Sequence, residues 1–397
     1  MSSVAKFREF VALMAVSMSM VALAIDSMLP ALSQIANDLS VSHANDRQLV
    51  ITVLFIGLAL GQLAYGPISD SVGRRSPIYV GFLLFILGSL VSAVATSFEM
   101  LLAGRFLQGL GAAGPRIITT AIIRDRSAGR EMARIMSLVM MVFILVPAIA
   151  PALGQLVLMV AHWRAIFLLL MILCALTAIW FFLRQPETLP VERRKAFKIT
   201  TLIYAMKEVL TNRVAVIYTL ASGLIFGAFV GFLNSAQQIL QELYGLGERF
   251  PAYFAVLALT IGLASWSNST LVMRLGMRKL CAMALWVITL SSIMFLIYCW
   301  QQPPSLVALM LFLVTIFFPT GILFGNFNAM AMEPLGHVAG MASSLIGSVT
   351  TLISLTLGYL IGAAYNGTVM PLVAGFVVLS GLSQVLMLRD NSKKTAI

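Results

Sequence analysis

Charged residues are scarce in this sequence of 397 residues: only 10% are Asp, Glu, Lys or Arg, whereas 60% are hydrophobic. An average soluble domain carries about 25% charged residues. Apolar stretches of about 20 residues, the length that crosses a hydrocarbon core about 30 Å thick, recur from one end of the chain to the other. This composition excludes an ordinary soluble protein and indicates a polytopic membrane protein.

Cysteine and histidine are also rare, with three residues of each. All three cysteines fall within or at the edge of apolar stretches, so they are interpreted as packing residues and predict neither a disulfide framework nor a metal site. The histidines fall in loops or at helix ends. The sequence contains no nucleotide-binding loop and no catalytic constellation. We therefore expect no cofactor, no direct use of ATP and no enzymatic activity.

Twelve apolar segments are candidate membrane-spanning helices. The first lacks a small-residue cleavage site and is too long for a secretory signal peptide, so we expect it to be retained. The predicted fold class is an all-α polytopic membrane protein. The segments cover residues about 10–33, 48–68, 77–96, 100–122, 136–158, 164–184, 213–238, 250–272, 280–299, 305–330, 339–363 and 369–388.

Lys and Arg residues gather in alternate loops, although the net charge of +11 alone is compatible with a nucleic-acid partner. One set of loops and chain ends holds 21 of the 26 basic residues, the opposite set holds three, and Arg105 and Arg116 lie inside the fourth segment. By the positive-inside rule, both termini are expected in the cytoplasm and the protein in the plasma (inner) membrane. The charge therefore reflects topology and predicts no nucleic-acid partner.

A hydrophilic stretch over residues 185–212 divides the spans six and six. We interpret it as a cytoplasmic linker with a surface helix around residues 197–210, whose basic residues face lipid headgroups. The predicted domains are therefore an N-terminal bundle of six helices, residues 1–184, and a C-terminal bundle, residues 213–397.

Two similar hairpins occupy matching places in these halves. "GPISDSVGRRSP" follows the second segment and "STLVMRLGMRKL" follows the eighth, and aligning Gly73 with Gly276 gives an offset of 203 residues. Short basic turns with glycine at matching places are expected of a duplicated transporter. Two unrelated tight hairpins are the alternative interpretation.

At these residues the chain resembles the major facilitator superfamily. "GQLAYGPISDSVGRRSP" is similar to the signature loop after the second helix of that family, and "RFLQGLGAAGPR" resembles its fourth-helix motif through Arg105, Gln108, Gly109 and Gly111. The resemblance implies two pseudo-symmetric bundles of six helices. The residues that match the signature loop are Gly66, Asp70, Gly73, Arg74 and Arg75.

Other motifs resemble the drug:proton antiporters of the Bcr/CflA type within that superfamily. "DSMLPAL" is similar to their first-helix motif through Asp26, Leu29 and Pro30, although Met28 and Ser33 depart from it. "VPAIAPALGQ" resembles the fifth-helix antiporter motif. It matches at Pro147, Pro151 and Gly154, which can bend a helix and let a neighbour come close, and departs at Ala150 and Gln155.

Asp26 is the most informative single residue, because a charge within the bilayer costs a few kcal/mol or more and is functional by default. Asp26 and Arg105 are expected at nearly the same depth. The resemblance implies that their helices both line the central cavity, where the two side chains would face each other or share water and couple transport to protons. A static structural ion pair is the alternative.

Four further residues are weaker candidates for binding substrate. Arg116 can face the ligand or snorkel toward the cytoplasm. Asn234, Gln237 and Gln238 lie within one turn and offer neutral hydrogen bonds either to a ligand or to neighbouring helices. Glu333, near the end of the tenth segment, is interpreted as a gate or capping residue.

The signature loop predicts a conformational lock. Gly66 and Gly73 are expected to permit tight turns, and Asp70 is expected to pair with Arg124 or Arg126 at the cytoplasmic end of the fourth segment. The resemblance implies that such a lock stabilises the outward-facing state. Anchoring by the positive-inside rule alone would explain the arginines, but neither the aspartate nor the glycines.

The sequence thus predicts a monomeric, proton-coupled exporter of small apolar or cationic compounds, antibiotics among them, that works by alternating access in the lipid bilayer. The alternatives are a transporter of the same fold dedicated to one metabolite, and a membrane receptor or enzyme without transport activity.

Overall fold

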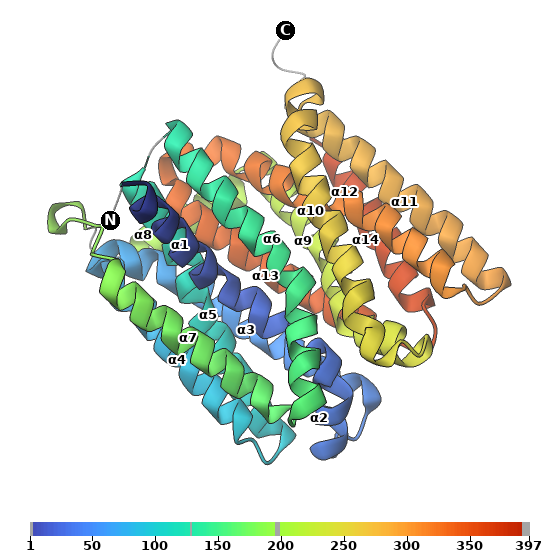
Figure 1. Ribbon diagram of the computed structural model, residues 1–397. Helices are drawn as coiled ribbons and strands as arrows, with labels where there is room; N and C mark the ends of the chain where they lie inside the picture. Colours follow the sequence, from blue (N-terminus) through green and yellow to red (C-terminus); the bar gives the residue numbers. More distant parts are fainter. Residues whose placement is uncertain (1–2, 128, 195–198, 391–397) are drawn as a thin grey trace, which may run out of the picture. The chain divides into compact units, whose positions relative to one another are not determined.

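The computed structural model describes residues 3–127, 129–194 and 199–390. Regular structure in these residues is entirely helical, without strands (Figure 1). The chain separates into two compact units, Met1–Leu202 and Ile203–Ile397, each with its own densely packed interior.

The first unit holds six long helices and the short elements that join them. Its short helices are η1 (Leu29–Ala31), α2 (Leu32–Asp38), η2 (Ala44–Gln48) and η3 (Val191–Arg193). The boundary between the two units, after Leu202, falls within helix α8 (Ile199–Thr211). The long helices are α1 (Ser3–Asp26), α3 (Leu49–Val72), α4 (Arg75–Ala93), α5 (Phe98–Arg126), α6 (Gly129–Val160) and α7 (Arg164–Arg184).

The second unit repeats this plan. Its short elements are the π-helix η4 (Gln237–Leu243), η5 (Gly247–Arg249) and η6 (Glu333–Val338). Its long helices are α9 (Arg213–Ala236), α10 (Phe250–Leu275), α11 (Met277–Gln301), α12 (Leu306–Met332), α13 (Ala339–Ala363) and α14 (Met370–Leu388).

Twelve helical segments among the described residues are long and apolar enough to cross a membrane, which confirms the predicted number. The first differs from the prediction in length, since it runs from Phe7 to Asp38 instead of over residues 10–33. It combines α1, η1 and α2, and the predicted outer boundary is therefore several residues too early. The predicted linker helix is also present, as α8.

Polar caps mark where several spans begin. The Ser97 hydroxyl accepts the backbone N–H of Met100 before α5, and Ser305 accepts that of Ala308 before α12. The Asn212 side chain caps α9 in the same way through Ala215. Each cap satisfies an N–H group that the first turn of a helix leaves without a partner.

The two interiors are packed on the same plan. In the first unit α3 and α4 pack along α5, and α1 packs against α5, α6 and α7. In the second unit α10 and α11 pack along α12, and α9 packs against α12, α13 and α14. A cluster of aromatic rings joins α9 to α12, and its closest pair, Phe232 and Phe317, has ring centroids 4.9 Å apart in an edge-to-face arrangement.

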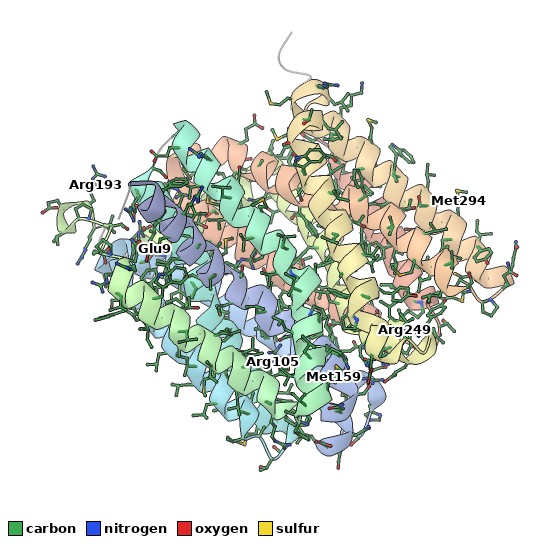
Figure 2. The ribbon with its side chains drawn as sticks, in the orientation of Figure 1. Glu9, Arg105, Met159, Arg193, Arg249 and Met294 are labelled. Atoms are coloured by element: carbon green, nitrogen blue, oxygen red, sulfur yellow. The ribbon has the colours of Figure 1, made fainter. Side chains whose placement is uncertain are left out.

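The outer faces of the spans are apolar and exposed. On α7, Ile172, Leu176 and Ile179 repeat at helical spacing and are each more than half exposed. On α11, Met294 is 71% exposed and projects outward in Figure 2. Such faces are unfavourable in water and favourable against lipid acyl chains, as expected for spanning helices.

Candidate functional site

The first span is broken beside its acid. α1 ends at Asp26, and Pro30 four residues later has no N–H with which to bond the Asp26 carbonyl. The chain closes the end of α1 through Ser27 instead, whose N–H and hydroxyl both donate to the Leu23 carbonyl, at 3.2 and 2.6 Å. The Leu-Pro motif thereby places a carboxylate at a helix end inside a spanning segment.

Asp26 is 5% exposed. No described residue forms a hydrogen bond or an ion pair with its carboxylate. A buried charge without a compensating group is costly in a protein interior. The site is therefore suited to a group that gains or loses a proton, or that meets a cation, during the protein's activity.

Gly154 of α6 contacts this break directly. A Cβ atom at Gly154 would lie 2.0 Å from the Ser27 carbonyl oxygen and 3.2 Å from Cγ of Pro30. Only glycine lets the two backbones come this close. Pro151 is buried one turn before it, while Pro147 is half-buried. The antiporter motif of α6 and the acidic motif of α1 therefore meet at one place.

Arg105 of α5, labelled in Figure 2, is fully buried and holds three helices together. Its Nε donates to the Val50 carbonyl at 2.8 Å, and its Nη1 donates to the Ala24 carbonyl at 3.0 Å and to Oε1 of Gln108 at 2.5 Å. Gln108 in turn donates to the Ser89 hydroxyl at 2.8 Å. The guanidinium therefore fixes α1 two residues before Asp26.

The structure shows no ion pair between Asp26 and Arg105 among the described residues. Arg105 bonds only to carbonyl and amide oxygens, and its Nη2 is buried without a hydrogen-bond partner. The planar guanidinium has five donors, and three of its hydrogen bonds go to Val50, Ala24 and Gln108. The assignment of the two residues to proton coupling stays a prediction.

Arg116 follows Arg105 by 11 residues, which places both on nearly the same face of α5, about 16 Å apart along the axis. Arg116 is half-buried, and no described residue forms a hydrogen bond or ion pair with its guanidinium. Unlike Arg105, it is thus a half-buried cation that no hydrogen bond or ion pair among the described residues of the first unit occupies.

The polar residues of α9 precede a rare helix type. Asn234 is 1% exposed, and both polar atoms of its side chain are buried without a hydrogen-bond partner among the described residues. Gln237 and Gln238 are buried as well and begin the π-helix η4, where Nε2 of Gln237 donates to Glu242 at 3.1 Å. π-helical turns occur frequently at functional sites, and an unsatisfied buried amide calls for an explanation.

A second cluster ties together the loop between α3 and α4, the end of α5, and the chain after α7. Nη1 of Arg74 lies 2.5 Å from the Asp70 carboxylate, while its Nε and Nη2 donate to both oxygens of Asp125, at 2.8 and 3.3 Å. Thr188 donates to Asp125 at 3.0 Å. Burial lowers the pKa of Arg74, but its hydrogen bonds to Asp125 and Asp70 outweigh that effect and raise it.

Glu187 is the most heavily bonded acid of this cluster. Its carboxylate accepts the backbone N–H groups of Arg74 and Arg75 at 2.9 and 3.0 Å, and those of Thr188 and Leu189 at 2.9 Å. Gly73 makes this possible: it adopts a φ of +100°, and a Cβ atom there would lie 2.7 Å from a Glu187 oxygen. The loop and the start of the linker are thereby fixed to each other.

Two details of the predicted lock were wrong. Asp70, in the last turn of α3, pairs with Arg74 and not with Arg124 or Arg126, because the turn at Gly73 brings Arg74 back to it. Arg124 is exposed, and Arg126 lies over the Phe10 ring at 4.4 Å.

Gly66 was also misinterpreted, since it lies inside α3, which continues to Val72. Of the two glycines, only Gly73 has a positive φ. The sequence reasoning further missed Asp125 and Glu187. An acid between two arginines and the "PET" motif after α7 were the available signals. Glu333 is exposed at the start of η6, directly after α12.

Comparison with known proteins identifies the family. The model of the Major Facilitator Superfamily matches residues 12–359. The chain is 34% identical over 347 residues to an uncharacterized MFS-type transporter, YdgK, of Bacillus subtilis, covering 85% of this chain and 84% of that one. It is 30% identical to the bicyclomycin resistance protein homolog of Haemophilus influenzae, covering 93% of each chain.

A third relative, multidrug resistance protein D of Escherichia coli, is 29% identical and covers 89% of this chain and 90% of its own length. In fold, the chain resembles the crystal structure of a D-xylose-proton symporter with a TM-score of 0.77, at 15% identity and with 98% of both chains covered. The protein is a multi-pass membrane transporter and not an enzyme. It belongs to the major facilitator superfamily, as its motifs predicted.

Proposed function

We propose that this transporter exports small apolar or cationic toxic compounds, antibiotics among them, in exchange for protons. It would work by alternating access as a monomer in the inner membrane, with both termini in the cytoplasm. Relatives named for bicyclomycin resistance and multidrug resistance support the class of substrate. The coupling mechanism is inferred from the first unit itself.

The observation that carries the proposal is the position of Asp26, a buried carboxylate at a helix break with no polar side chain committed to it. A structural acid inside a membrane protein is normally paired. Asp26 is instead left for a proton or a cationic substrate. Gly154 contacts the backbone at Ser27, next to Asp26, and Arg105 bonds the Ala24 carbonyl two residues before it. The backbone that carries the carboxylate is therefore held in place while its occupant changes.

Coupling follows from the energy of that carboxylate. When the site is closed to water on both sides, an ionised and unoccupied Asp26 would cost several kcal/mol. A proton or a cationic substrate removes this cost, so only the occupied carrier crosses the closed state. Each export step is therefore followed by the entry of a proton. This strict exchange lets an antiporter use the proton gradient to drive export.

Arg105 and Arg116 are assigned different parts in this mechanism. Arg105 positions α1 through the Ala24 carbonyl and places a fixed positive charge beside the end of that helix. Arg116, which has no hydrogen-bond or ion-pair partner among the described residues, is available to an anionic or carbonyl group of a substrate. Removing Arg105 should therefore change the coupling and the structure, and removing Arg116 should change the choice of substrate.

The second unit would supply neutral recognition. The Asn234 amide, three residues before the π-helix η4, offers two N–H donors and one acceptor that no described residue satisfies. Together with Gln237 and Gln238, it can bond polar groups of varied ligands without a charge requirement, while nearby phenylalanines such as Phe229 and Phe232 offer apolar contact. Such a surface favours breadth over selectivity.

The test is proton-driven drug accumulation in inverted vesicles with an imposed pH gradient. Asp26→Asn imitates the protonated form permanently, so accumulation should fall to background while binding of a neutral drug persists. Asp26→Glu should retain partial accumulation, because the titratable group survives about one methylene away. Full accumulation by Asp26→Asn would make Asp26 structural and would move the coupling role to another acid, with Glu333 the next candidate.

A growth-inhibition panel in an efflux-deficient bacterium separates this proposal from its rival. Expression of the protein should raise resistance to several unrelated compounds, and Asp26→Asn should abolish the gain. If no compound in the panel changes, the fold and the proton site would fit a transporter dedicated to one metabolite, and the drug-export proposal would fail.

A further inference from the structure

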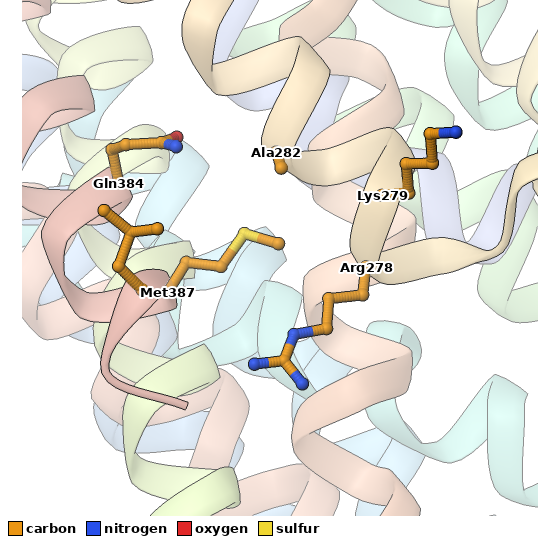
Figure 3. Close-up of a pocket in the computed structure, with 6 residues that line it drawn as sticks. Arg278, Lys279, Ala282, Gln384 and Met387 are labelled. Carbon is orange, nitrogen blue, oxygen red and sulfur yellow. The ribbon is translucent and has the colours of Figure 1, made fainter. Parts of the chain in front are cut away.

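The second unit contains a cavity of about 320 Å³ between the start of α11 and the end of α14. Figure 3 shows Gln384 and Met387 of α14 on one side and Arg278, Lys279 and Ala282 of α11 on the other. Leu388 completes the lining. No role in transport assigned above uses this cavity, which lies wholly within one unit and next to the Gly276 turn.

The corresponding place in the first unit is filled. At the offset of 203 residues, Ala282 corresponds to Tyr79 and Gln384 corresponds to Phe181. Tyr79 and Phe181 pack edge to face with their ring centroids 5.9 Å apart. At matching positions, the first half therefore has two packed aromatic rings, whereas the second half has the smaller side chains of Ala282 and Gln384 and a cavity.

The polar groups of the cavity are poorly satisfied by the protein. Gln384 is 6% exposed, and its Oε1 is buried without a hydrogen-bond partner. Lys279 is exposed at the rim, and no described residue bonds its ammonium group. An amide enclosed in an otherwise apolar wall costs free energy unless a ligand bonds it.

Arg278 supplies a positive charge that is held in position. It donates to the Asp390 backbone carbonyl and lies 3.5 Å from the Asp390 carboxylate, which also accepts the Tyr218 hydroxyl at 2.7 Å. Asp390 balances one of the two cations, so the mouth of the cavity keeps a net charge of about one positive unit. The first turn of α11 adds the positive end of a helix dipole.

We propose that this cavity binds the headgroup of an anionic phospholipid that carries hydroxyl groups, such as phosphatidylglycerol. The phosphate would meet Lys279 and Arg278, and a glycerol hydroxyl would donate to Oε1 of Gln384. Basic pockets between membrane helices on the cytoplasmic side bind lipid headgroups of this kind. Ala282, Met387 and Leu388 offer apolar contact to the glycerol backbone.

A lipid is favoured over a soluble phosphate by the surface around the cavity. Leu388 is 70% exposed, and Val385 on the same helix and Trp286 on α11 are each about half exposed. These side chains extend the apolar face of the spans up to the basic rim. A ligand with a phosphate next to acyl chains matches both parts, whereas a free phosphate matches only the rim.

The experiment is native mass spectrometry of the whole protein released from mixed micelles that contain phosphatidylglycerol and phosphatidylcholine in equal amounts. The wild type should retain phosphatidylglycerol in preference. Lys279→Gln and Gln384→Leu should each lower that retention by about fivefold, the effect of roughly one charge or hydrogen bond near a headgroup. Arg274→Gln is the matched control, since Arg274 is basic, exposed and on the same hairpin but outside the cavity.

Thermal unfolding in detergent verifies that each variant is folded before its lipids are counted. Equal retention by wild type, Lys279→Gln and Gln384→Leu would overturn the proposal, as would an equal loss in Arg274→Gln, which would indicate a diffuse surface charge. Adding soluble glycerol phosphate at millimolar concentration should displace little lipid. Complete displacement would assign the cavity to a soluble phosphate ester and reject the lipid.

Discussion

The two cytoplasmic hairpins have the same turn and different anchors. Gly73 and Gly276 both adopt a positive φ, and the acids that anchor the hairpins, Glu187 and Asp390, are also separated by 203 residues. Glu187 accepts backbone N–H groups of its hairpin, whereas Asp390 receives the Arg278 side chain. Each half therefore carries an acid after its last span, and this acid bonds to the hairpin between the second and third spans of the same half.

The membrane interiors of the halves differ in a parallel way. At the same offset, Asp26 corresponds to Phe229. The caps Ser97 and Ser305 are 208 residues apart, and at that offset Arg105 corresponds to Leu313. The buried charges of the first half therefore have apolar counterparts in the second. The irregular part of the first span is a break at Asp26, and that of the seventh is a π-helix. The two halves thus share a scaffold but differ in buried charge, which matches the division proposed above between proton handling in the first half and neutral binding in the second.

The largest effect is expected at Arg105, which has no counterpart in the second half. Arg105→Ala should destabilise the protein by about 3 kcal/mol or more, because the Val50 and Ala24 carbonyls and the Gln108 amide lose their shared donor. Residual transport should have a displaced pH optimum. Unfolding temperature in detergent and a transport pH profile measure the two effects.

Arg105→Lys separates charge from geometry in that experiment. A lysine keeps the positive charge but cannot reach three acceptors with a rigid fork, so stability should fall while the pH optimum remains. An unchanged pH profile in an active Arg105→Ala variant would reduce Arg105 to a packing residue.

A matched pair of glycine substitutions tests the two turns directly. Gly73→Ala and Gly276→Ala should each cost about 1–2 kcal/mol for the positive φ. Gly73→Ala should cost more, because its methyl group would meet Glu187, whereas a Cβ at Gly276 meets nothing within 4 Å. Thermal unfolding compares the variants. In a background that already carries Glu187→Ala, Gly73→Ala should cost no more than Gly276→Ala. If the two glycine substitutions cost the same while Glu187 is present, the anchoring role of Glu187 would be contradicted.

These residues show which features of the structure can be predicted from the sequence. The number of spans, the hairpins and the acid at Asp26 are all readable, because hydropathy, charge asymmetry and a misplaced carboxylate are local patterns. The partners of Arg105 and Arg74 are not readable in this way. They depend on which carbonyl or carboxylate lies within 3 Å across helices that are distant in sequence, and one turn of error changes the answer.

The break after Asp26 is an intermediate case. Pro30 predicts a disturbed helix, but the direct contact of Gly154 with the Ser27 carbonyl depends on how two helices pack. The cavity at Gln384 could not be predicted from the sequence, because a cavity depends on how completely the side chains of neighbouring helices fill the space between them.

A moderate effect is expected at Asp70, whose counterpart in the second half is Met273. Asp70→Asn should lower transport while leaving substrate binding largely intact, because it weakens the Arg74 cluster and touches no ligand. Stability should change by less than about 1 kcal/mol, since this ion pair is partly exposed. Turnover and binding are measured separately. Glu131→Gln, an exposed acid at the start of α6, is the control, and wild-type turnover in Asp70→Asn would exclude a lock.

The smallest effect concerns the pH dependence of the first anchor. Burial raises the pKa of Glu187, but the N–H groups of Arg75, Leu189, Arg74 and Thr188 outweigh it and hold the pKa below its ordinary value of 4.5. A carboxyl whose pKa is depressed in the folded state stabilises the protein above its unfolded pKa, and this contribution is lost as pH falls through the folded-state value.

Glu187→Gln should therefore lower the unfolding temperature by a constant amount between about pH 6 and 8, and the difference from wild type should shrink below about pH 4.5. The loss at neutral pH corresponds to about 1 kcal/mol, because an amide oxygen replaces a carboxylate that accepts four N–H groups. Glu192→Gln, an exposed residue of the same linker, should show no such difference. A difference that is equal at every pH would mean that the shape of Glu187, and not its charge, holds the hairpin, and the resemblance between Glu187 and Asp390 would then be one of position only.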